Sequence, residues 1–160
     1  MSTWCGLLHQ HGSGERLAES HLPRGKVITV SLEENKRLVR RYYEEVLNQR
    51  RPEVFDELAD PQFRSYLANG GSVDIGVYKQ AIAGSLAAMP DLHVRVDDQI
   101  AEGDKVVTRW TARGTSQVEF AGIQPQDRPL TLTAIHSHRI QGGKFIEHWE
   151  AINLHSVKLG

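Results

Sequence analysis

The chain has 160 residues, a hydrophobic content of 39%, a charged content of 24% and a formal net charge of −1 at neutral pH. These values are ordinary for a globular protein and suit one domain that is large enough to bury a core. A net charge near zero gives no electrostatic reason to expect nucleic acid or an anionic membrane as a partner. Cys5 is the only cysteine, which excludes an intrachain disulfide and a multi-cysteine zinc site.

Residues 1–29 show no sustained periodicity and contain Gly12-Ser13-Gly14 and Pro23. We therefore expect a flexible N-terminal extension over 1–29 and a single domain over 30–160. No apolar run approaches the roughly 20 residues needed to span a bilayer. The run from Trp4 to Leu8 is too short for a secretory leader. We expect a cytoplasmic protein that does not bind membranes.

The first ordered element is predicted to begin at Ser31. Ser31 and Glu34 have the spacing of a capping box, in which each side chain binds the other residue's free backbone N–H. This helix is expected to end near Asn48. Its apolar positions recur at helical spacing and are Leu38, Val39, Tyr42, Tyr43, Val46 and Leu47.

Two further helices and a short strand are expected before residue 92. Pro52 suits the first turn of a short helix over 53–58, and a strand is predicted at 63–67. A third helix is expected over about 77–89, where Pro90 ends it.

From Leu92 onward the sequence predicts β-strands, because apolar and polar residues alternate. Gly103-Asp104 and Gly142-Gly143 suit two-residue hairpin turns, since glycine readily adopts the positive φ that these turns need. Helices followed by a four-stranded antiparallel meander predict an α+β domain, with the helices on one face of a curved sheet.

The hairpin over 130–153 carries polar residues on its more apolar face. Alternation along its first arm puts His136 and His138 in one row with leucine, alanine and isoleucine. Unbroken pairing from the turn sets His138 opposite Glu147 and His136 opposite Trp149. The inward-facing residues of the second arm are then Phe145, Glu147, Trp149 and Asn153. This arrangement predicts the lining of a ligand pocket.

Two roles stay open for each of these residues. A carboxylate such as Glu147 opposite His138 fixes the imidazole tautomer and raises its basicity, as a general base requires. The alternative is a cross-strand polar pair that stabilises the sheet. His136 is either a core residue or a ligand contact, and Trp149 and Tyr43 either fill the core or line the pocket.

The hairpin over 92–115 repeats the pattern. Its turn sets Asp98 opposite Arg109, and both fall on the face of the apolar valines. The pair either fixes the register of the sheet as a buried ion pair or orients a substrate through its charges.

The sequence gives little reason to expect a cofactor. His136, His138 and Glu147 would make a three-ligand set for a metal ion, but nothing else in the sequence asks for one. There is no glycine-rich phosphate loop, no dinucleotide fingerprint and no nucleophile elbow. We expect neither a metal nor an organic cofactor.

About four fifths of the chain, from Ser31 onward, resembles the SnoaL-like ester and polyketide cyclases of the NTF2-like superfamily. The resemblance rests on segments 34–46, 89–94, 100–104, 109–115, 119–123 and 143–149. It implies a cone of α+β type, in which a curved antiparallel sheet and about three N-terminal helices surround a deep apolar pocket. It also implies a dimer through the sheet. In characterised cyclases of the family a pocket carboxylate removes a proton, polar groups including histidine steady the enolate, and an aldol step closes a ring without a cofactor.

The last strand departs from the family pattern. Relatives often read Trp-x-x-x-Asp there, whereas this chain has Asn153 four residues after Trp149. Asparagine donates hydrogen bonds but cannot accept a proton as a base. The base would then be Glu147 with His138, Glu150 after a one-residue shift in register, or Asp98.

These observations predict a cofactor-independent enzyme acting on a small apolar, carbonyl-bearing molecule, with aldol-type cyclisation as the leading reaction. The expected catalytic residues are His138, Glu147 and Asp98, and the expected substrate-binding residues are His136, Arg109, Trp149, Asn153 and Tyr43. The alternatives are a non-catalytic ligand-binding or dimerisation module, or an isomerase or hydrolase of the same fold. A cavity of about 300 Å³ or more that His138 and Glu147 both reach would favour the enzyme.

Overall fold

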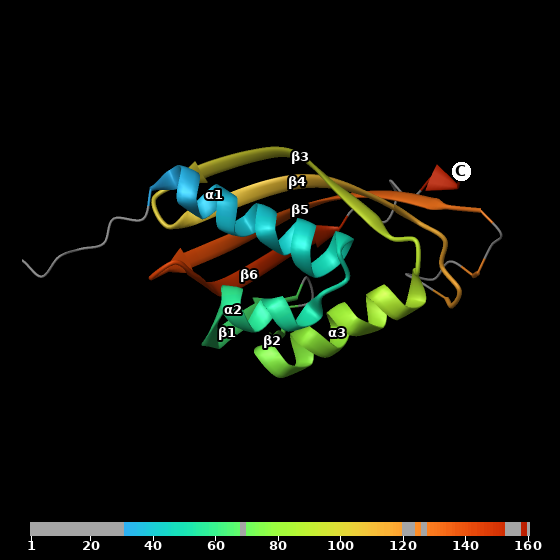
Figure 1. Cartoon of the computed structure of the whole chain (residues 1–160), viewed down its shortest axis with the longest axis horizontal. Coiled ribbons are helices and arrows are strands. Elements are labelled where there is room, and N and C mark those ends of the chain that lie inside the picture. Colours follow the sequence, from blue (N-terminus) through green and yellow to red (C-terminus); the bar gives the residue numbers. More distant parts are fainter. Residues whose placement is uncertain (1–30, 68–69, 120–123, 126–127, 153–157, 160) are drawn as a thin grey trace, which may run out of the picture.

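The computed structural model describes residues 31–67, 70–119, 124–125, 128–152 and 158–159. The predicted extension over 1–29 and the predicted substrate contact Asn153 lie outside the described residues. Within them, a curved sheet with strand order β2-β1-β6-β5-β4-β3 carries the helices, and β7 pairs with β5 (Figure 1). No helix in this part of the chain is long and apolar enough to cross a membrane.

The first helix begins as predicted. The Ser31 hydroxyl accepts a hydrogen bond from the Glu34 backbone N–H at 3.2 Å, and the Glu34 carboxylate accepts one from the Ser31 N–H at 2.7 Å. Helix α1 (Leu32–Arg41) continues into a π-helical segment, η1 (Tyr42–Asn48), so the helix ends at the expected residue. Its buried residues Val39, Tyr42, Tyr43 and Val46 belong to the core.

The next helices also match the prediction. A 3-10 turn, η2 (Pro52–Val54), leads into α2 (Phe55–Leu58). Helix α3 (Ile75–Ala88) begins at Asp74, whose side chain accepts a hydrogen bond from the Val77 N–H at 3.0 Å. Helix α1 runs along β3 and β4, while α3 lies near β1 and β2 (Figure 1).

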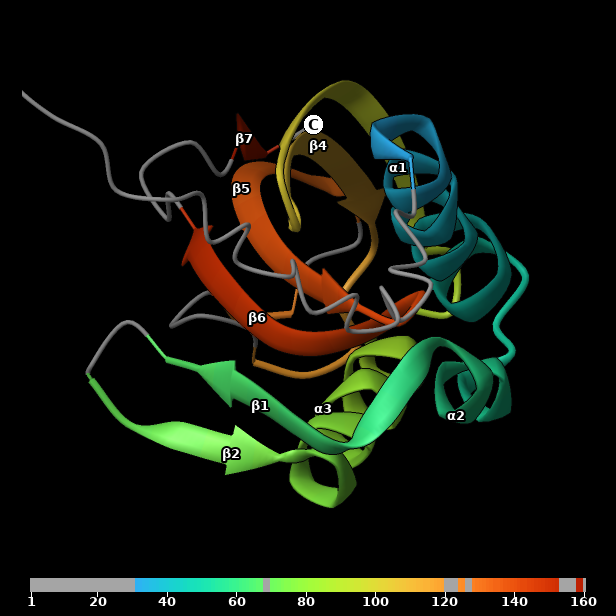
Figure 2. The same cartoon turned by 90° about the vertical axis from the view of Figure 1, so that its left-hand side faces the viewer.

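The four-stranded meander is confirmed as β3 (His93–Glu102), β4 (Lys105–Gly114), β5 (Leu130–Gln141) and β6 (Lys144–Ile152). Figure 2 shows how strongly its strands curve. Strand β1 (Ala59–Tyr66) adds in parallel to β6, and β2 (Ser72–Asp74) pairs antiparallel with β1. Strand β7 (Lys158–Leu159) pairs with the start of β5. The sheet is therefore mixed, whereas a purely antiparallel sheet was expected.

Both hairpin turns form where the glycines predict them. Gly103, Gly142 and Gly143 have φ values of 57°, 57° and 76°, in the region that glycine tolerates without strain. Gln141 pairs with Lys144, and Glu102 pairs with Lys105, as expected.

A β-bulge in β6 reverses the expected faces beyond the turn. Ile140 pairs with Phe145 and Arg139 pairs with Glu147, so Ile146 is an extra residue without a direct partner. A one-residue insertion exchanges the two faces of a strand. The predicted inward placement of Glu147 and Trp149 is therefore wrong: Glu147 lies beside Arg139 on the outer face, and Trp149 is 49% exposed.

A second bulge in β3 has the same effect. Asp98 pairs with Arg109 as predicted, but Asp97 is the extra residue between Val96 and Asp98. Asp98 and Arg109 are consequently exposed on the outer face, so their predicted inward placement is also wrong. Arg109 instead donates a hydrogen bond to the half-buried Asp97 carboxylate at 3.3 Å.

Asn48 fastens the end of the helix to the sheet. Its side-chain oxygen accepts a hydrogen bond from the Val94 N–H at 2.8 Å, and its side-chain nitrogen donates to the Val94 carbonyl at 2.9 Å. The amide of Asn48 therefore completes the backbone bonding of Val94 where β3 has no further strand beside it.

We expect Asn48→Ala to lower the free energy of unfolding by about 2 kcal/mol or more, because two part-buried backbone groups lose their partners. Urea denaturation of the variant and of the exposed-site control Gln49→Ala measures the difference. The control should change by less than about 0.5 kcal/mol. Equal stability of the two variants would contradict the role assigned to Asn48.

Candidate functional site

One pocket, with a volume of about 170 Å³, lies between the helices and the inner face of the sheet. Most of its wall is apolar, and its polar side chains come from η1, α3, β5 and β6. The lining residues are Tyr42, Leu47, Tyr78, Ala81, Ile82, Ser85, Met89, Leu92, Val94, Trp110, Ala112, Leu132, His136 and Glu150. The pocket is smaller than the predicted 300 Å³, and neither His138 nor Glu147 lines it.

Of the residues that the structure describes, Glu150 is the only acidic one in this wall. The bulge at Ile146 turns its side chain inward, and in the β5–β6 register it pairs with His136. Burial raises the pKa of the Glu150 carboxyl above its ordinary value of 4.5. A carboxylate that is partly removed from water is a stronger base than an exposed one, so Glu150 is suited to accept a proton.

Two tyrosines, Tyr42 and Tyr78, line the same pocket. The Tyr42 and Tyr78 oxygens lie 3.0 Å apart, within hydrogen-bond distance. Burial raises the pKa of Tyr42 to about 12, although the hydrogen bond with Tyr78 lowers it, and the charge of Glu150 raises it further. Burial also raises the pKa of Tyr78 well above 10.0. Both hydroxyls therefore keep their protons at neutral pH, and the pair has one proton to donate beyond the bond that it shares.

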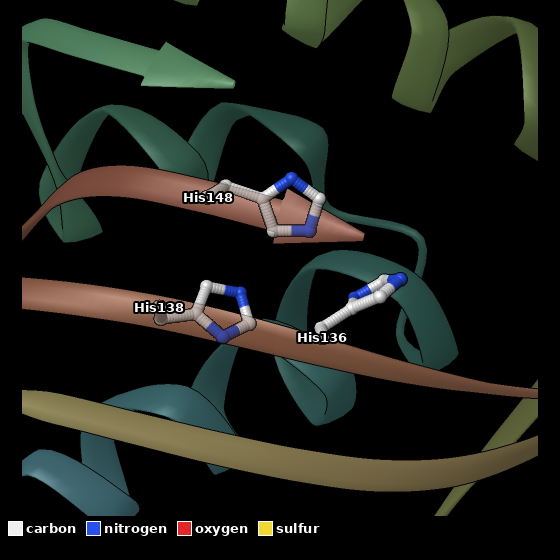
Figure 3. Close-up of side chains that lie close together, drawn as sticks. All are labelled: His136, His138 and His148. Atoms are coloured by element: carbon white, nitrogen blue, oxygen red, sulfur yellow. The ribbon is translucent and has the colours of Figure 1, made fainter. Parts of the chain in front are cut away.

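Three histidines meet behind this wall (Figure 3). His136 and His138 come from β5 and His148 comes from β6, and all three are at most 6% exposed. The ring centroid of His148 lies 4.6 Å from that of His136 and 5.0 Å from that of His138. The Tyr43 hydroxyl lies 3.1 Å from His136 Nδ1, and the Ser65 hydroxyl lies 2.9 Å from His148 Nδ1.

These histidines are neutral at physiological pH. Burial lowers the pKa of His148 to about 3 and holds those of His136 and His138 well below 6.5. The nearby His148 lowers the pKa of His136 and His138 further. The pairing of His138 with a carboxylate, on which the predicted acid–base unit depended, is not formed: its ring packs 4.9 Å from that of Phe145.

The structure therefore distributes the predicted site residues over two faces. His136 lines the pocket, while His138 and Tyr43 lie directly behind it in the core. Glu147 forms an ion pair with Arg139 at 2.9 Å, and Trp149 stacks on the ring of Tyr66 at 4.1 Å. Asp98 and Arg109 lie with them on the outer face.

Sequence reasoning gave no functional role to three residues of the inner face, namely Tyr42, Tyr78 and His148. Glu150 was expected only as an alternative base that needed a shift in register. Strict alternation along β6 puts Glu150, His148 and Ile146 on one face. Phe145, which is fully buried, would then lie on the opposite face. A strand that must bury both Phe145 and His148 needs an extra residue between them, and that requirement was the available clue.

Acid should destabilise the fold through the buried histidines. In the unfolded chain they accept protons below about pH 6.5. In the folded chain their pKa values are depressed, to about 3 for His148, so the fold excludes those protons. The free energy of unfolding should therefore fall between about pH 6.5 and pH 5, by up to about 1.4 kcal/mol per pH unit for each histidine.

The variant His148→Phe, which removes one of these groups while keeping an aromatic ring, should show a shallower pH dependence. Urea denaturation near pH 7 and near pH 5 measures both slopes. The exposed residue His93 provides the control variant His93→Gln, which should keep the wild-type slope. If His148→Phe shows the slope of the wild type, His148 does not enter the fold in its neutral form.

Comparison with known proteins agrees with this fold. The family model described as SnoaL-like polyketide cyclase matches residues 37–158. AclR from Streptomyces galilaeus, described as "a putative hydroxylase", is 29% identical with a TM-score of 0.70, and the match covers 78% of each chain. IdmH from Streptomyces antibioticus, described as "a putative polyketide cyclase", is 29% identical with a TM-score of 0.66, covering 74% of this chain and 91% of IdmH.

A third solved structure, a "Putative SnoaL-like polyketide cyclase" from Jannaschia sp. CCS1, has 22% identity and a TM-score of 0.70. The match covers 84% of this chain and 93% of that one, and it shows the fold alone. No curated protein sequence matches the chain. The matched segment covers most of the domain, from α1 to β7, and the TM-scores of 0.66 to 0.70 show that the three solved structures share its fold. The chain therefore belongs to the SnoaL-like polyketide cyclase family and has the α+β cone of the NTF2-like fold.

Proposed function

We propose that the protein is an acid–base enzyme that removes a proton next to a carbonyl group of a small apolar molecule, with Glu150 as the base. The observation that carries the proposal is the half-buried Glu150 carboxyl, the only acidic group that the described residues place in this largely apolar pocket. Membership of the family supports a cyclase-type role. The neighbours described as a hydroxylase and a cyclase leave the reaction itself open.

The residues suit an intramolecular aldol step. The Glu150 carboxylate takes a proton from the carbon beside a carbonyl, and the resulting enolate oxygen accepts a hydrogen bond from the Tyr42–Tyr78 pair. The enolate carbon then attacks a second carbonyl of the same molecule and forms a carbon–carbon bond. The new alkoxide takes the proton held by Glu150, which restores the carboxylate and balances the reaction.

The pocket wall limits the substrate class. Ile82, Met89 and Leu132 are among the apolar side chains that exclude water and favour an apolar ring or chain. A volume of about 170 Å³ accommodates one small ring system or the reacting end of a larger molecule. None of the described residues that line the pocket is positively charged, so a neutral carbonyl compound fits better than a carboxylate or a phosphate.

A non-catalytic ligand-binding module is the second candidate. The small volume and the single charged group favour it, because binding an apolar molecule requires no base. Retention of ligand binding without proton transfer would distinguish this module from an enzyme.

We expect Glu150→Gln to lower the rate of α-proton exchange by about 100-fold or more, since glutamine cannot accept the proton. The exchange is followed by NMR in D₂O with a panel of aryl ketones and aryl β-keto esters. The exchange rate of the wild type should fall as the pH drops through the raised pKa of Glu150, because protonation removes the base.

The matched control is Glu147→Gln, which changes the neighbouring carboxylate on the outer face and should leave the rate unchanged. Circular dichroism checks that both variants fold. If enzyme-catalysed exchange persists in Glu150→Gln at the wild-type rate, another group is the base. Tight binding of a panel member with no exchange above the buffer rate would favour the binding module.

We also propose that a second copy of the chain covers the outer face of the sheet. Four large apolar residues are exposed there, each on a different strand of the meander: Ile100, Val107, Ile135 and Trp149. Ile100 pairs directly with Val107. Val107 also pairs with Ser137, which in turn pairs with Trp149. The surrounding ring of residues carries both signs of charge, with Asp98 and Glu147 beside Arg109 and Arg139, as a two-fold self-complementary interface needs.

Placing a charge in this apolar patch should separate the two copies. We expect the wild type to be a dimer and Ile135→Lys to be a monomer, as measured by light scattering after size-exclusion chromatography. Val77 is equally exposed, at 47%, but lies on α3, so Val77→Lys should remain a dimer. A monomeric wild type would contradict the proposed interface.

A further inference from the structure

We propose that His136, His138 and His148 form a binding site for one divalent transition-metal ion of the zinc type. One ring nitrogen from each residue can be chosen so that all three lie within 4.8 Å of one another. Figure 3 shows the three rings gathered over the face of the two neighbouring strands β5 and β6. The inference goes beyond the proposed function and does not rest on it, although His136 also borders the pocket.

The backbone dictates this meeting of three imidazoles. His136 and His138 are two residues apart on β5, so they point to the same face. His148 pairs directly with His138 in the β5–β6 register, and the bulge at Ile146 turns it to that same face. The three ligands therefore stand on two neighbouring hydrogen-bonded strands, a rigid base for a metal site.

The protonation state suits metal binding. Neutral imidazole is the form that coordinates an ion, and burial of all three rings favours the neutral form. Zinc, copper and nickel accept such nitrogen ligands. The sequence suggests Glu147, opposite His138, as a third ligand, although no metal is expected from it. In the structure His148 takes this position opposite His138.

Each ring also has a nitrogen that nothing in the described part of the chain satisfies. His136 Nε2, His138 Nδ1 and His148 Nε2 are buried and have no hydrogen-bond partner. Buried polar atoms nearly always have one, so three such atoms in one cluster point to a group that the polypeptide alone does not supply. Buried polar atoms without partners cost free energy, which apolar side chains in their place would not. A bound ion would supply the partner and would explain why the core holds three imidazoles.

The groups around the rings resemble the outer shell of a metal site. Histidines that bind a metal through one nitrogen usually donate the other N–H to an oxygen, which fixes the tautomer and the ring orientation. Ser65 Oγ lies 2.9 Å from His148 Nδ1, which leaves His148 Nε2 free to face an ion. Both Ser65 and His148 are almost fully buried, so this bond is shielded from water.

The rings need a modest adjustment to close on an ion. Three nitrogens at about 2.0–2.1 Å from one tetrahedral zinc ion lie roughly 3.3 Å apart, somewhat nearer than the present 4.8 Å limit. Rotation of the side chains about their χ angles is the adjustment that the site requires. Three histidines leave the fourth position of a tetrahedral ion to water or to a ligand atom.

Metal titration of the full chain, purified without a histidine tag and stripped with EDTA, tests the site. We expect one equivalent of Co²⁺ to produce the intense visible absorption of a tetrahedral nitrogen site, and one equivalent of Zn²⁺ to displace it. Zinc should also raise the melting temperature of the wild type. Absence of the tetrahedral spectrum from the wild type would overturn the proposal.

Variants locate the ion. His148→Phe and His138→Phe should bind Zn²⁺ at least 100-fold more weakly by isothermal titration calorimetry. Ser65→Ala keeps all three ligands and should weaken binding by about 10–100-fold through loss of the orienting bond. The controls are His93→Gln on the surface and a double variant of the tail, His9→Ala with His11→Ala, which should bind like the wild type.

Each outcome decides the proposal. Unchanged zinc affinity in His148→Phe would place the ion elsewhere and overturn the proposal. Loss of zinc binding in the double variant of His9 and His11 would do the same. If the phenylalanine variants do not fold, the wild-type Co²⁺ spectrum and the Ser65→Ala affinity still decide. Proton exchange measured in EDTA tests the role of Glu150 separately, so either proposal can fail while the other stands.

Discussion

The interior of this domain depends on the bulge at Ile146, which decides which side chains of β6 face the core. With the extra residue in place, Phe145, His148 and Glu150 point inward, while Glu147 and Trp149 point outward. Without the bulge Phe145 would still face inward, but Glu147 and Trp149 would take the inward places of His148 and Glu150. The identity of the candidate base and the composition of the histidine cluster both follow from this single insertion.

The bulge adds His148 and Glu150 to a largely apolar core, in which buried polar groups must stay uncharged. Burial favours the neutral form of His136, His138 and His148 and keeps the Tyr42 and Tyr78 hydroxyls protonated. The same effect raises the pKa of Glu150, which shares the pocket wall with Tyr42, Tyr78 and His136 but alone among these groups is only partly buried. The degree of burial therefore distinguishes Glu150, whose carboxyl can exchange protons, from the buried histidines and tyrosines, whose rings cannot. Neutral imidazoles in turn are suited to a metal ion.

Much of the fold could be predicted because its local determinants lie in short stretches of sequence. The capping box at Ser31, the proline at 90 and the glycine turns at 103 and 142 each act on their own backbone. The face assignments beyond the bulges could not be predicted in the same way. Alternation is counted from the turn, so one extra residue, Asp97 in β3 or Ile146 in β6, inverts every residue that follows. The parallel pairing of β1 with β6 joins segments that are far apart in the sequence, and neither segment has a local pattern that predicts it.

The central claim is that Glu150 faces the pocket and is partly removed from water, whereas Glu147 faces outward. Titration of the glutamate side-chain carboxyl carbons by NMR tests this claim most directly, with the Glu150 resonance assigned by its loss in Glu150→Gln. The account predicts a Glu150 pKa above the ordinary 4.5, and a Glu150 resonance that shifts when an aryl ketone binds. A Glu150 pKa at or below 4.5, with the ligand-induced shift appearing on Glu147 instead, would contradict it.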